Sequence, residues 1–336
     1  MENVIKKKRG LSRNQKRLIF YTLMVAWPVM QTILFYVYVN FNTILLAFQR
    51  YDIAPSGLGY VVSFDSSFSS FHTAWNELIV DQLGYIGNGL KFYAIDFPVG
   101  LTLALTFSYY IYKKYPGHGL FKTMLFMPSL ISGMVFCIIF KYIVYYGYME
   151  LMCMTNGLEV TYANMMSFES GTLLYNASSA VPTIIFDNIW ISFGSNILLY
   201  SGGMSGIDDS IVESCHLDGA NVIQEMVNIT LPLIFPTIIS LVVVSLTGMF
   251  TNQLGLLGLY GDSMDGLSSE TRKAVTTIGF RMYILSQKIG VNATNIDNLE
   301  YTTTHLSAYG LTISAFLIPI VLTVRKMLKK YGPSAD

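Results

Sequence analysis

Long apolar runs alternate with short polar segments along this chain. Six of the runs approach or exceed the roughly 20 residues that an α-helix needs to cross a bilayer. We therefore predict six membrane-spanning helices, over residues 18–46, 89–112, 121–145, 180–203, 231–250 and 305–324. A further apolar stretch, residues 275–285, is too short to cross and predicts a re-entrant or interfacial helix.

Basic residues at the ends of the apolar runs predict the topology. Lysines and arginines crowd the first 17 residues, the turn at 113–119 and the tail at 325–336. Because positive residues concentrate on the cytoplasmic side of a membrane, we expect both termini to be cytoplasmic. The predicted organisation is a basic N-terminal segment (1–17), a transmembrane region (18–324) and a basic tail. The first apolar run is too long for a signal-peptide core, and we expect it to be a spanning helix.

Composition supports a multi-pass membrane protein and gives no indication of a nucleic-acid partner. Of the 336 residues, 52% are hydrophobic and only 12% are charged, whereas soluble domains carry about 25% charged residues. The net charge is zero, so the chain lacks the overall positive charge typical of nucleic-acid-binding proteins. The three cysteines and four histidines are scattered, and their spacing predicts neither a disulfide framework nor a metal site.

The segment between the fourth and fifth apolar runs, residues 207–236, is acidic. It contains no lysine or arginine, and its acids are Asp208, Asp209, Glu213, Asp218 and Glu225. Side-chain oxygens at 208–210 suit the free amide groups of a first helical turn, which predicts a short helix over residues 211–217. Gly219 follows, and glycine is the usual residue at the left-handed end of a helix.

A second short helical run is predicted over residues 220–229. It should end against Leu231-Pro232, since proline lacks an N–H group and is tolerated only at the start of the next helix. Together the two runs predict a helix-turn-helix at the membrane surface, joined rigidly to the fifth span. Counting the spans places this unit on the cytoplasmic side. We interpret it as a docking lever.

These residues resemble the EAA loop of permeases from binding-protein-dependent ABC importers, whose pattern is EAA, a spaced G and then I-x-LP. The matching positions are Glu213, Ser214, Cys215, Gly219, Ile229, Leu231 and Pro232. Ser-Cys replaces Ala-Ala, which keeps the side chains small. The resemblance extends to AFQRYD (47–52), LFMPSLIS (125–132) and LDGAN (217–221), and it points to the oligosaccharide and polysaccharide branch, which includes maltose-type permeases.

The resemblance implies an all-α fold of the type I ABC importer permease, with about six transmembrane helices and a cytoplasmic coupling helix. It also implies a bacterial plasma membrane location. The implied partners are a second homologous permease subunit, two copies of a cytoplasmic ATPase that bind ATP and Mg, an extracellular substrate-binding protein and an oligosaccharide substrate. Within the loop (207–232) it assigns ATPase coupling to the matched residues above and to Asp218.

The chain itself shows no catalytic motif. There is no G-x-x-x-x-G-K-[ST] phosphate loop, so we expect a non-catalytic subunit without a cofactor of its own. Polar residues inside apolar helices usually face a cavity or a partner helix. The candidates for a substrate path are Asp187, Asn188, Trp190, Asn196 and Asn252. Interhelical hydrogen bonding by Asp187 and Asn188 is the alternative.

Asp96 is the other acid within a predicted span. We expect it to form a structural ion pair with Lys91 or Lys141. Two other functions remain open from the sequence. A gradient-driven secondary transporter or channel would work without an ATPase and would usually contain an inverted repeat. A non-transporting assembly or sensor subunit would use the acidic loop only as a docking surface.

Overall fold

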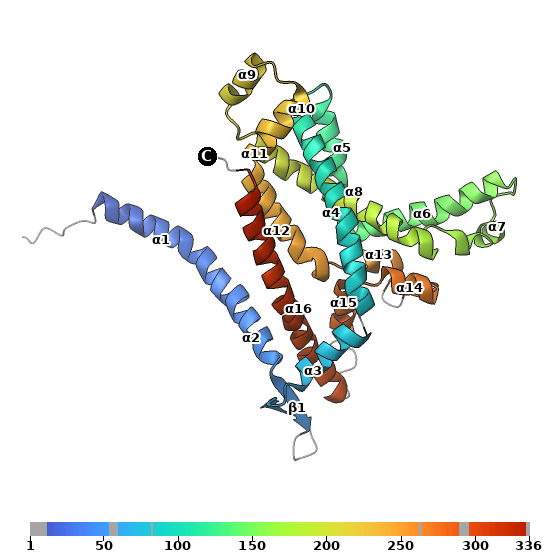
Figure 1. Ribbon diagram of the computed structural model, residues 1–336. Helices are drawn as coiled ribbons and strands as arrows, with labels where there is room; N and C mark the ends of the chain where they lie inside the picture. The colour runs from blue at the N-terminus through green and yellow to red at the C-terminus, as the bar shows by residue number, and fades with distance from the viewer. Residues whose placement is uncertain (1–11, 54–59, 82, 262–263, 289–295, 334–336) are drawn as a thin grey trace, which may run out of the picture.

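The computed structural model describes residues 12–53, 60–81, 83–261, 264–288 and 296–333, and within these ranges it is almost entirely helical. The first helical rod consists of α1 (Arg13–Gln31), the π-helix η1 (Thr32–Tyr38) and α2 (Val39–Leu46). Ser12 and Gln15 form a capping box at its start. Figure 1 shows that α1 stands apart from the other helices and that α2 approaches α16.

A small hairpin follows this rod. Strands β1 (Gln49–Ile53) and β2 (Tyr60–Phe64) pair antiparallel, with Gln49 opposite Phe64. The hairpin leads into α3 (Ser69–Asn76) and the π-helix η2 (Glu77–Asp81). The prediction of an all-α chain therefore holds except for these two strands. We call this part of the molecule the hairpin end.

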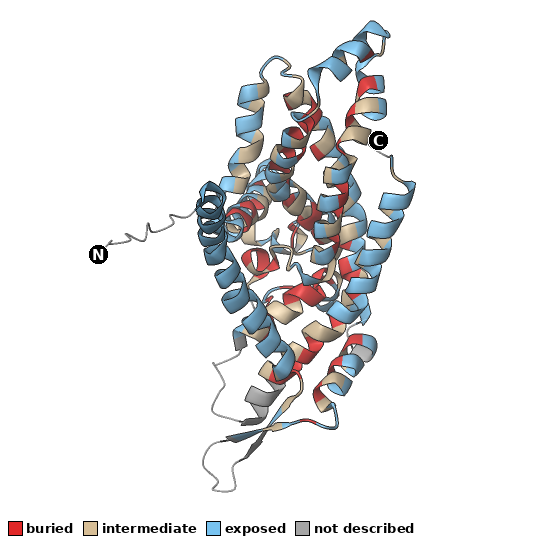
Figure 2. Ribbon diagram, turned by 90° about the vertical axis from the view of Figure 1, so that its left-hand side faces the viewer, coloured by how far each residue is buried: buried red, intermediate tan, exposed pale blue. Residues whose placement is uncertain are grey.

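Three helices form most of the body: α4 (Leu83–Tyr112), α8 (Ala177–Met204) and α12 (Phe235–Thr251). The contact between α4 and α8 is the most extensive between any two described elements. It buries Ala104 against Ile197 in a shared hydrophobic cluster, and the Ser108 hydroxyl donates a hydrogen bond to the Ile197 carbonyl at 3.0 Å. Figure 2 shows the buried residues gathered along the middle of this body.

The predicted third span, residues 121–145, is wrong in its boundaries. The chain instead forms α5 (His118–Leu130) and α6 (Gly133–Thr155). Ile131 and Ser132 between them have extended backbone angles, so the intrahelical hydrogen bonds stop there. In Figure 1, α5 lies beside α4, whereas α6 projects away from the body towards α7 (Tyr162–Met166). The short 3₁₀-helix η3 (Glu169–Gly171) leads back to α8.

In the described part of the chain, three short helices precede the last long helix, and the first two pack against α6 and α8. They are α13 (Leu256–Tyr260), α14 (Ser269–Val275) and α15 (Ile278–Lys288), and α16 (Ile296–Tyr331) follows. Residues 275–285, predicted as a non-crossing helix, fall largely in α15, whose 11 residues span only about 16 Å. Phe280 and Ile284 bury this helix against the body.

Among the described residues, five helices are long and apolar enough to cross a membrane: 13–46, 83–112, 133–155, 235–260 and 303–331. α8, with 28 residues, is also long enough, but Ser, Asn and Gly residues reduce its hydropathy. The prediction of about six spans is consistent with these helices. α1 begins at Arg13 and α16 continues to Tyr331, so parts of the basic segments predicted at 1–17 and 325–336 are helical. Residues 1–11 lie outside the described part.

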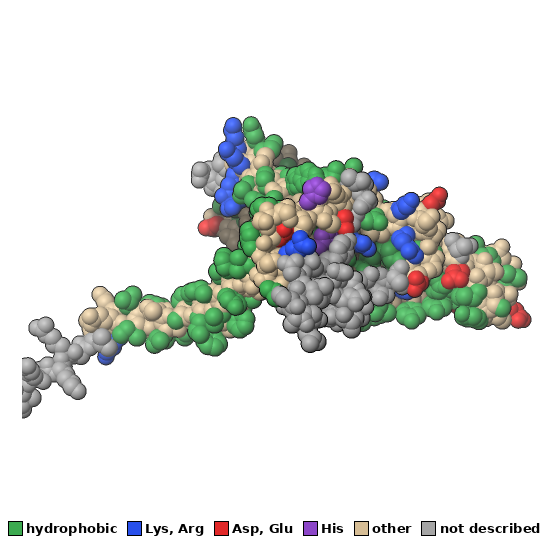
Figure 3. Space-filling model, turned by 90° about the horizontal axis from the view of Figure 1, so that it is seen from below, with side chains coloured by type: hydrophobic (Ala, Val, Ile, Leu, Met, Phe, Trp, Pro, Cys, Tyr) green, Lys and Arg blue, Asp and Glu red, His purple; other side chains and the backbone are tan. Residues whose placement is uncertain are grey.

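Hydrophobic side chains cover the two parts that project from the body, which are the first helical rod and the arm that contains α6. None of the apolar window of the first rod is buried, and large side chains such as Leu23, Phe35 and Tyr38 are 69, 73 and 69% exposed. Figure 3 shows apolar side chains along the arm on the left, formed by α1, and along the arm on the right. Such surfaces suit a lipid or protein environment rather than water.

Candidate functional site

The acidic segment folds into two short helices, as predicted. α9 spans Asp209–Leu217 and α10 spans Val222–Glu225. The Asp208 carboxylate caps α9 by accepting a hydrogen bond from the Ser210 amide at 2.9 Å, and this bond lowers the pKa of Asp208. Asn221 and Gln224 form a capping box at the start of α10. The two helices stand at the end of the molecule opposite the hairpin end, which we call the loop end (Figure 1).

Gly219 makes the turn between the two helices. Its φ is +78°, in the left-handed region, and the Ala220 amide donates to the Cys215 carbonyl while the Gly219 amide donates to the His216 carbonyl. This pair of bonds is a Schellman motif. Nothing lies within 4 Å of the position where a Cβ would stand. The glycine is therefore required by backbone conformation and not by crowding.

The predicted coupling residues divide by exposure. Glu213, Ser214, Asp218 and Gly219 are exposed, Ile229, Leu231 and Pro232 are half-buried, and Cys215 is buried. Cys215 therefore packs inward and does not share the outer face with Ser214. Apolar side chains also lie on the outside of the loop, with Leu217 at 89% and Ile223 at 72% exposed. The tip thus combines acids with an apolar surface.

The second helical run extends further than predicted. The π-helix η4 (Met226–Thr230) follows α10 directly, and α11 (Leu231–Leu233) continues it. Pro232 lies at the second residue of α11 and has no N–H group to donate to the helical turn that precedes it. The chain bends only at Ile234, before α12. The loop is therefore joined to α12 through almost continuous helix.

A buried ion cluster attaches the loop to α4, and the sequence analysis did not predict it. The Glu225 side chain is fully buried; one of its oxygens lies 2.6 Å from Lys113 Nζ and the other 3.3 Å from His216 Nε2. The Tyr109 hydroxyl donates a hydrogen bond to the Val222 carbonyl at 3.3 Å. These groups come from three separate stretches of the chain, and no sequence motif predicts their meeting.

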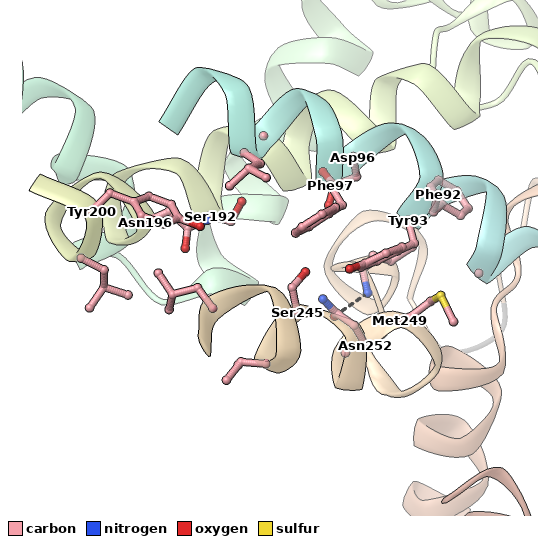
Figure 4. Close-up of a pocket in the computed structure, with 18 residues that line it drawn as sticks. Phe92, Tyr93, Asp96, Phe97, Ser192, Asn196, Tyr200, Ser245, Met249 and Asn252 are labelled. Carbon is pink, nitrogen blue, oxygen red and sulfur yellow. Dashed lines mark hydrogen bonds between the residues drawn. The ribbon is translucent and has the colours of Figure 1, made fainter. Parts of the chain in front are cut away.

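A cavity of about 340 Å³ lies between α4, α8 and α12, within the ~300–1,000 Å³ range of small-molecule sites. Its polar and aromatic lining residues are Tyr93, Asp96, Phe97, Ser192, Asn196, Tyr200, Ser245 and Asn252. Tyr93 and Phe97 stack with ring centroids 5.0 Å apart. Figure 4 shows these two rings facing Ser245 of α12 and Asn252, which directly follows α12. The cavity combines hydrogen-bonding groups with aromatic faces.

A second cavity, of about 330 Å³, lies against α6, α8 and the segment before α13. It shares Asp96, Ser192 and Asn252 with the first cavity and adds Asn188 and Gln253. Three of the five predicted substrate-path residues therefore line a cavity: Asn188, Asn196 and Asn252. The other lining residues, Tyr93, Ser192 and Ser245, carry no signal that separates them from ordinary residues of a spanning helix.

Asp187 and Trp190 line neither cavity. Asp187 is 1% exposed, and its carboxylate accepts a hydrogen bond from the Cys137 thiol at 3.3 Å. Trp190 packs its ring edge-to-face against Phe136 of α6. Both side chains join α8 to α6. For Asp187 this agrees with interhelical hydrogen bonding, the alternative to a place in the substrate path. Asn188 also makes a packing contact, since its amide donates to the Leu254 carbonyl, in the segment between α12 and α13, at 3.2 Å.

The expected pairing of Asp96 with Lys91 or Lys141 is wrong. Asp96 lines both cavities, and one oxygen of its carboxylate is buried without a hydrogen-bond partner among the described residues. Figure 4 shows the side chain beside Phe97 at the cavity wall. A buried carboxylate oxygen that lacks a partner is a good acceptor for a hydroxyl group that enters the cavity.

Comparisons with known proteins relate most of the chain to membrane transport. The family described as "Binding-protein-dependent transport system inner membrane component" matches residues 97–325. The probable ABC transporter permease YesP of Bacillus subtilis is 28% identical over 200 residues, which cover 58% of this chain and 59% of YesP, a little under two thirds. The arabinooligosaccharides permease AraP of the same organism is 27% identical over 68% of each chain.

A solved structure has the same fold. It is a chain of a bacterial ABC transporter described as importing the acidic polysaccharide alginate, with a TM-score of 0.65 and 19% identity. The alignment covers 96% of this chain and 100% of that one. At this identity the similarity concerns the arrangement of helices, which agrees with the type I permease fold expected from the sequence.

Proposed function

Because the chain belongs to the family of binding-protein-dependent transport system inner membrane components, we propose that it is the permease subunit of an ATP-driven importer for an oligosaccharide or polysaccharide fragment. An extracellular binding protein delivers the substrate. The further partners are a second homologous permease subunit and two copies of a cytoplasmic ATPase, which bind ATP and Mg. The loop end and both termini face the cytoplasm, in a bacterial plasma membrane.

One observation carries the proposal: an exposed helical loop is joined without a flexible linker to the helices around an intramembrane cavity. The loop continues through η4 and α11 into α12, and α12 forms one wall of the larger cavity. A displacement of the loop is therefore transmitted to the cavity. This connection suits a subunit that converts ATPase closure into alternating access.

The residues have separate roles in this proposal. Glu213 and Asp218, both exposed, contact the ATPase together with the apolar surface around Leu217. Gly219 holds the turn, and Leu231-Pro232 transmits the movement into α12. In the cavity, Asp96, Asn196 and Asn252 accept or donate hydrogen bonds to sugar hydroxyls. The stacked rings of Tyr93 and Phe97 pack against the apolar face of a sugar ring.

The proposal is tested by purifying the tagged protein from its native membrane and identifying the proteins that accompany it. We expect an ATPase and a second permease subunit. In liposomes, we expect ATP-dependent uptake of an oligosaccharide when its binding protein is present. Transport by this chain alone, without ATP, would instead establish a secondary transporter or channel. Recovery of partners with no transport of any tested oligosaccharide would refute the sugar substrate.

A further inference from the structure

Glu225 occupies a position where three elements of the loop end meet. It belongs to α10, Lys113 follows the last residue of α4, and His216 lies in α9. The side chain of Glu225 is fully buried, and that of Lys113 is 15% exposed. A fully buried carboxylate is costly unless it is paired, so the contact to Lys113 holds α10 firmly against the end of α4.

Neighbouring groups reinforce this attachment. Lys113 Nζ lies 5.9 Å from the ring centroids of both Tyr109 and Tyr112, within the range of cation–π attraction. The Tyr109 hydroxyl holds the backbone of α10 through the Val222 carbonyl. The last turn of α4 therefore holds α10 by an ion pair and a hydrogen bond, and the two rings hold Lys113 in place for the ion pair.

α4 continues from this attachment to the cavity without interruption. Tyr93, Asp96 and Phe97, all on α4, line the cavity. The 16 residues from Phe97 to Lys113 correspond to about 24 Å of helix. Pro98 lies inside α4 and removes one backbone hydrogen bond there, but the helix is continuous over Leu83–Tyr112. An axial or tilting movement at Lys113 is thus carried along one helix to the cavity wall that faces α12.

We propose that Glu225 and Lys113 form a second transmission path from the coupling loop to the substrate cavity, parallel to the covalent path through Leu231-Pro232. This inference rests on the proposed function and goes beyond it. The covalent path moves α12, and the ion pair moves α4, so both walls of the cavity respond to one displacement of α9. Glu225 and Lys113 are positioning residues and do not contact the substrate.

The test compares Glu225→Gln and Lys113→Met with the charge-reversed pair Glu225→Lys/Lys113→Glu. The purified complex in liposomes is assayed with binding protein and oligosaccharide for both uptake and ATP hydrolysis. We expect each single variant to retain its ATPase subunits and to lose roughly tenfold in substrate transported per ATP, the size of an ordinary allosteric coupling. The reversed pair should recover most of this loss. Lys114→Met, at an exposed position in the same turn, is the matched control and should behave as the wild type.

Two outcomes overturn the proposal. One is an unchanged ratio of transport to hydrolysis in both single variants. The other is a reversed pair that transports no more substrate per ATP than the single variants, since the ion pair itself would then not transmit the movement.

Melting temperatures of the wild type, both single variants and the reversed pair are measured separately, because they report the ion pair without any ATPase. In one outcome, the effects of the two single substitutions on the melting temperature are non-additive in the reversed pair, while the wild type recovers no ATPase and uses no ATP. That result would refute both the proposed function and the transmission role, because the ion pair would then be purely structural. If the effects of the two substitutions on the melting temperature are additive and the wild type is driven by ATP, only the second transmission path is refuted.

Discussion

Single atoms decide how closely the helices approach one another. A Cβ at Gly194 of α8 would lie 2.4 Å from the Leu125 carbonyl oxygen and 2.8 Å from the Phe126 Cα of α5. Because both neighbours are backbone atoms, they cannot turn aside as a side chain would. The sequence shows that residue 194 is a glycine, but the reason for it depends on which helix lies opposite, and that could not be predicted.

Gly194→Ala should therefore separate α5 from α8. We expect a loss of about 1–3 kcal/mol in the free energy of unfolding, the usual cost of overpacking, measured by thermal unfolding in detergent. Gly202→Ala is the matched control on the same helix, since nothing lies within 4 Å of its added Cβ. Equal melting temperatures for the two variants would contradict the close approach.

Asp65 stabilises the start of α3 at the hairpin end. Burial raises the pKa of this carboxyl, but four hydrogen bonds from the amides and hydroxyls of Ser67 and Ser69 outweigh burial and lower the pKa to about 2, from 3.8. A carboxyl whose pKa is lower in the folded state stabilises the fold above its unfolded pKa. This stabilisation is lost as the pH falls from about 4 towards 2.

Asp65→Asn should therefore remove most of the acid sensitivity of the hairpin end. We expect the variant to be about 2 kcal/mol less stable than the wild type near neutral pH, with the difference disappearing towards about pH 2. Hydrogen exchange of the amides of residues 65–76, followed as a function of pH, measures this difference in stability. Ser66→Ala, at an exposed position, should leave the pH profile unchanged. A difference that stays constant with pH would show that the ionised form is not what stabilises the helix.

At the scale of elements, the sequence predicted most helices because each is marked by local features. The cap at Asp208 and the turn at Gly219 are confirmed by the hydrogen bonds found there. The capping box at Asn221 was not predicted. The break at Ile131 and Ser132 was not predicted, although Pro128, Ser129 and Gly133 lie beside it, because the run is long enough to cross as one helix. The β1–β2 hairpin was not predicted, because the sequence analysis assigns no element between the first two spans.

Gly219→Leu should weaken coupling between the loop and its partners. A side chain at φ +78° costs about 1–2 kcal/mol, which favours a different turn between α9 and α10. We expect reduced ATPase co-purification and reduced uptake. Gly202→Leu, at an exposed helical position on α8, controls for the added bulk. Normal uptake together with normal ATPase recovery in Gly219→Leu would refute the lever role.

At the scale of the whole molecule, the cavity depends on three helices that are far apart in sequence. Asn188, Asn196 and Asn252, chosen from the sequence as substrate-path candidates, each line a cavity, and their contact with a substrate stays a prediction. The sequence could not separate them from Asp187, which lies one residue from Asn188 on α8 and turns towards Cys137 of α6. Adjacent helical residues point about 100° apart, so only the packing of α6 against α8 decides between their roles.

Asp96→Ala and Asp187→Ala should accordingly have different effects. Asp96→Ala removes an acceptor from the cavity wall and should reduce uptake several-fold while the complex still assembles. Asp187→Ala leaves a void beside the Cys137 thiol and should lower the melting temperature and the yield of complex. Uptake and subunit recovery measured side by side distinguish the two. Loss of assembly in Asp96→Ala with intact assembly in Asp187→Ala would reverse the assignment.

The burial of Cys215 offers a native chemical probe. All three cysteines are buried and unpaired, and buried thiols react slowly with alkylating reagents. Cys215, 5% exposed, is the one that lies in the coupling loop, between the acidic tip and the Glu225 cluster. The rate at which maleimide labels Cys215 in the wild-type chain would therefore report how tightly α9 is held against the body, without any introduced cysteine.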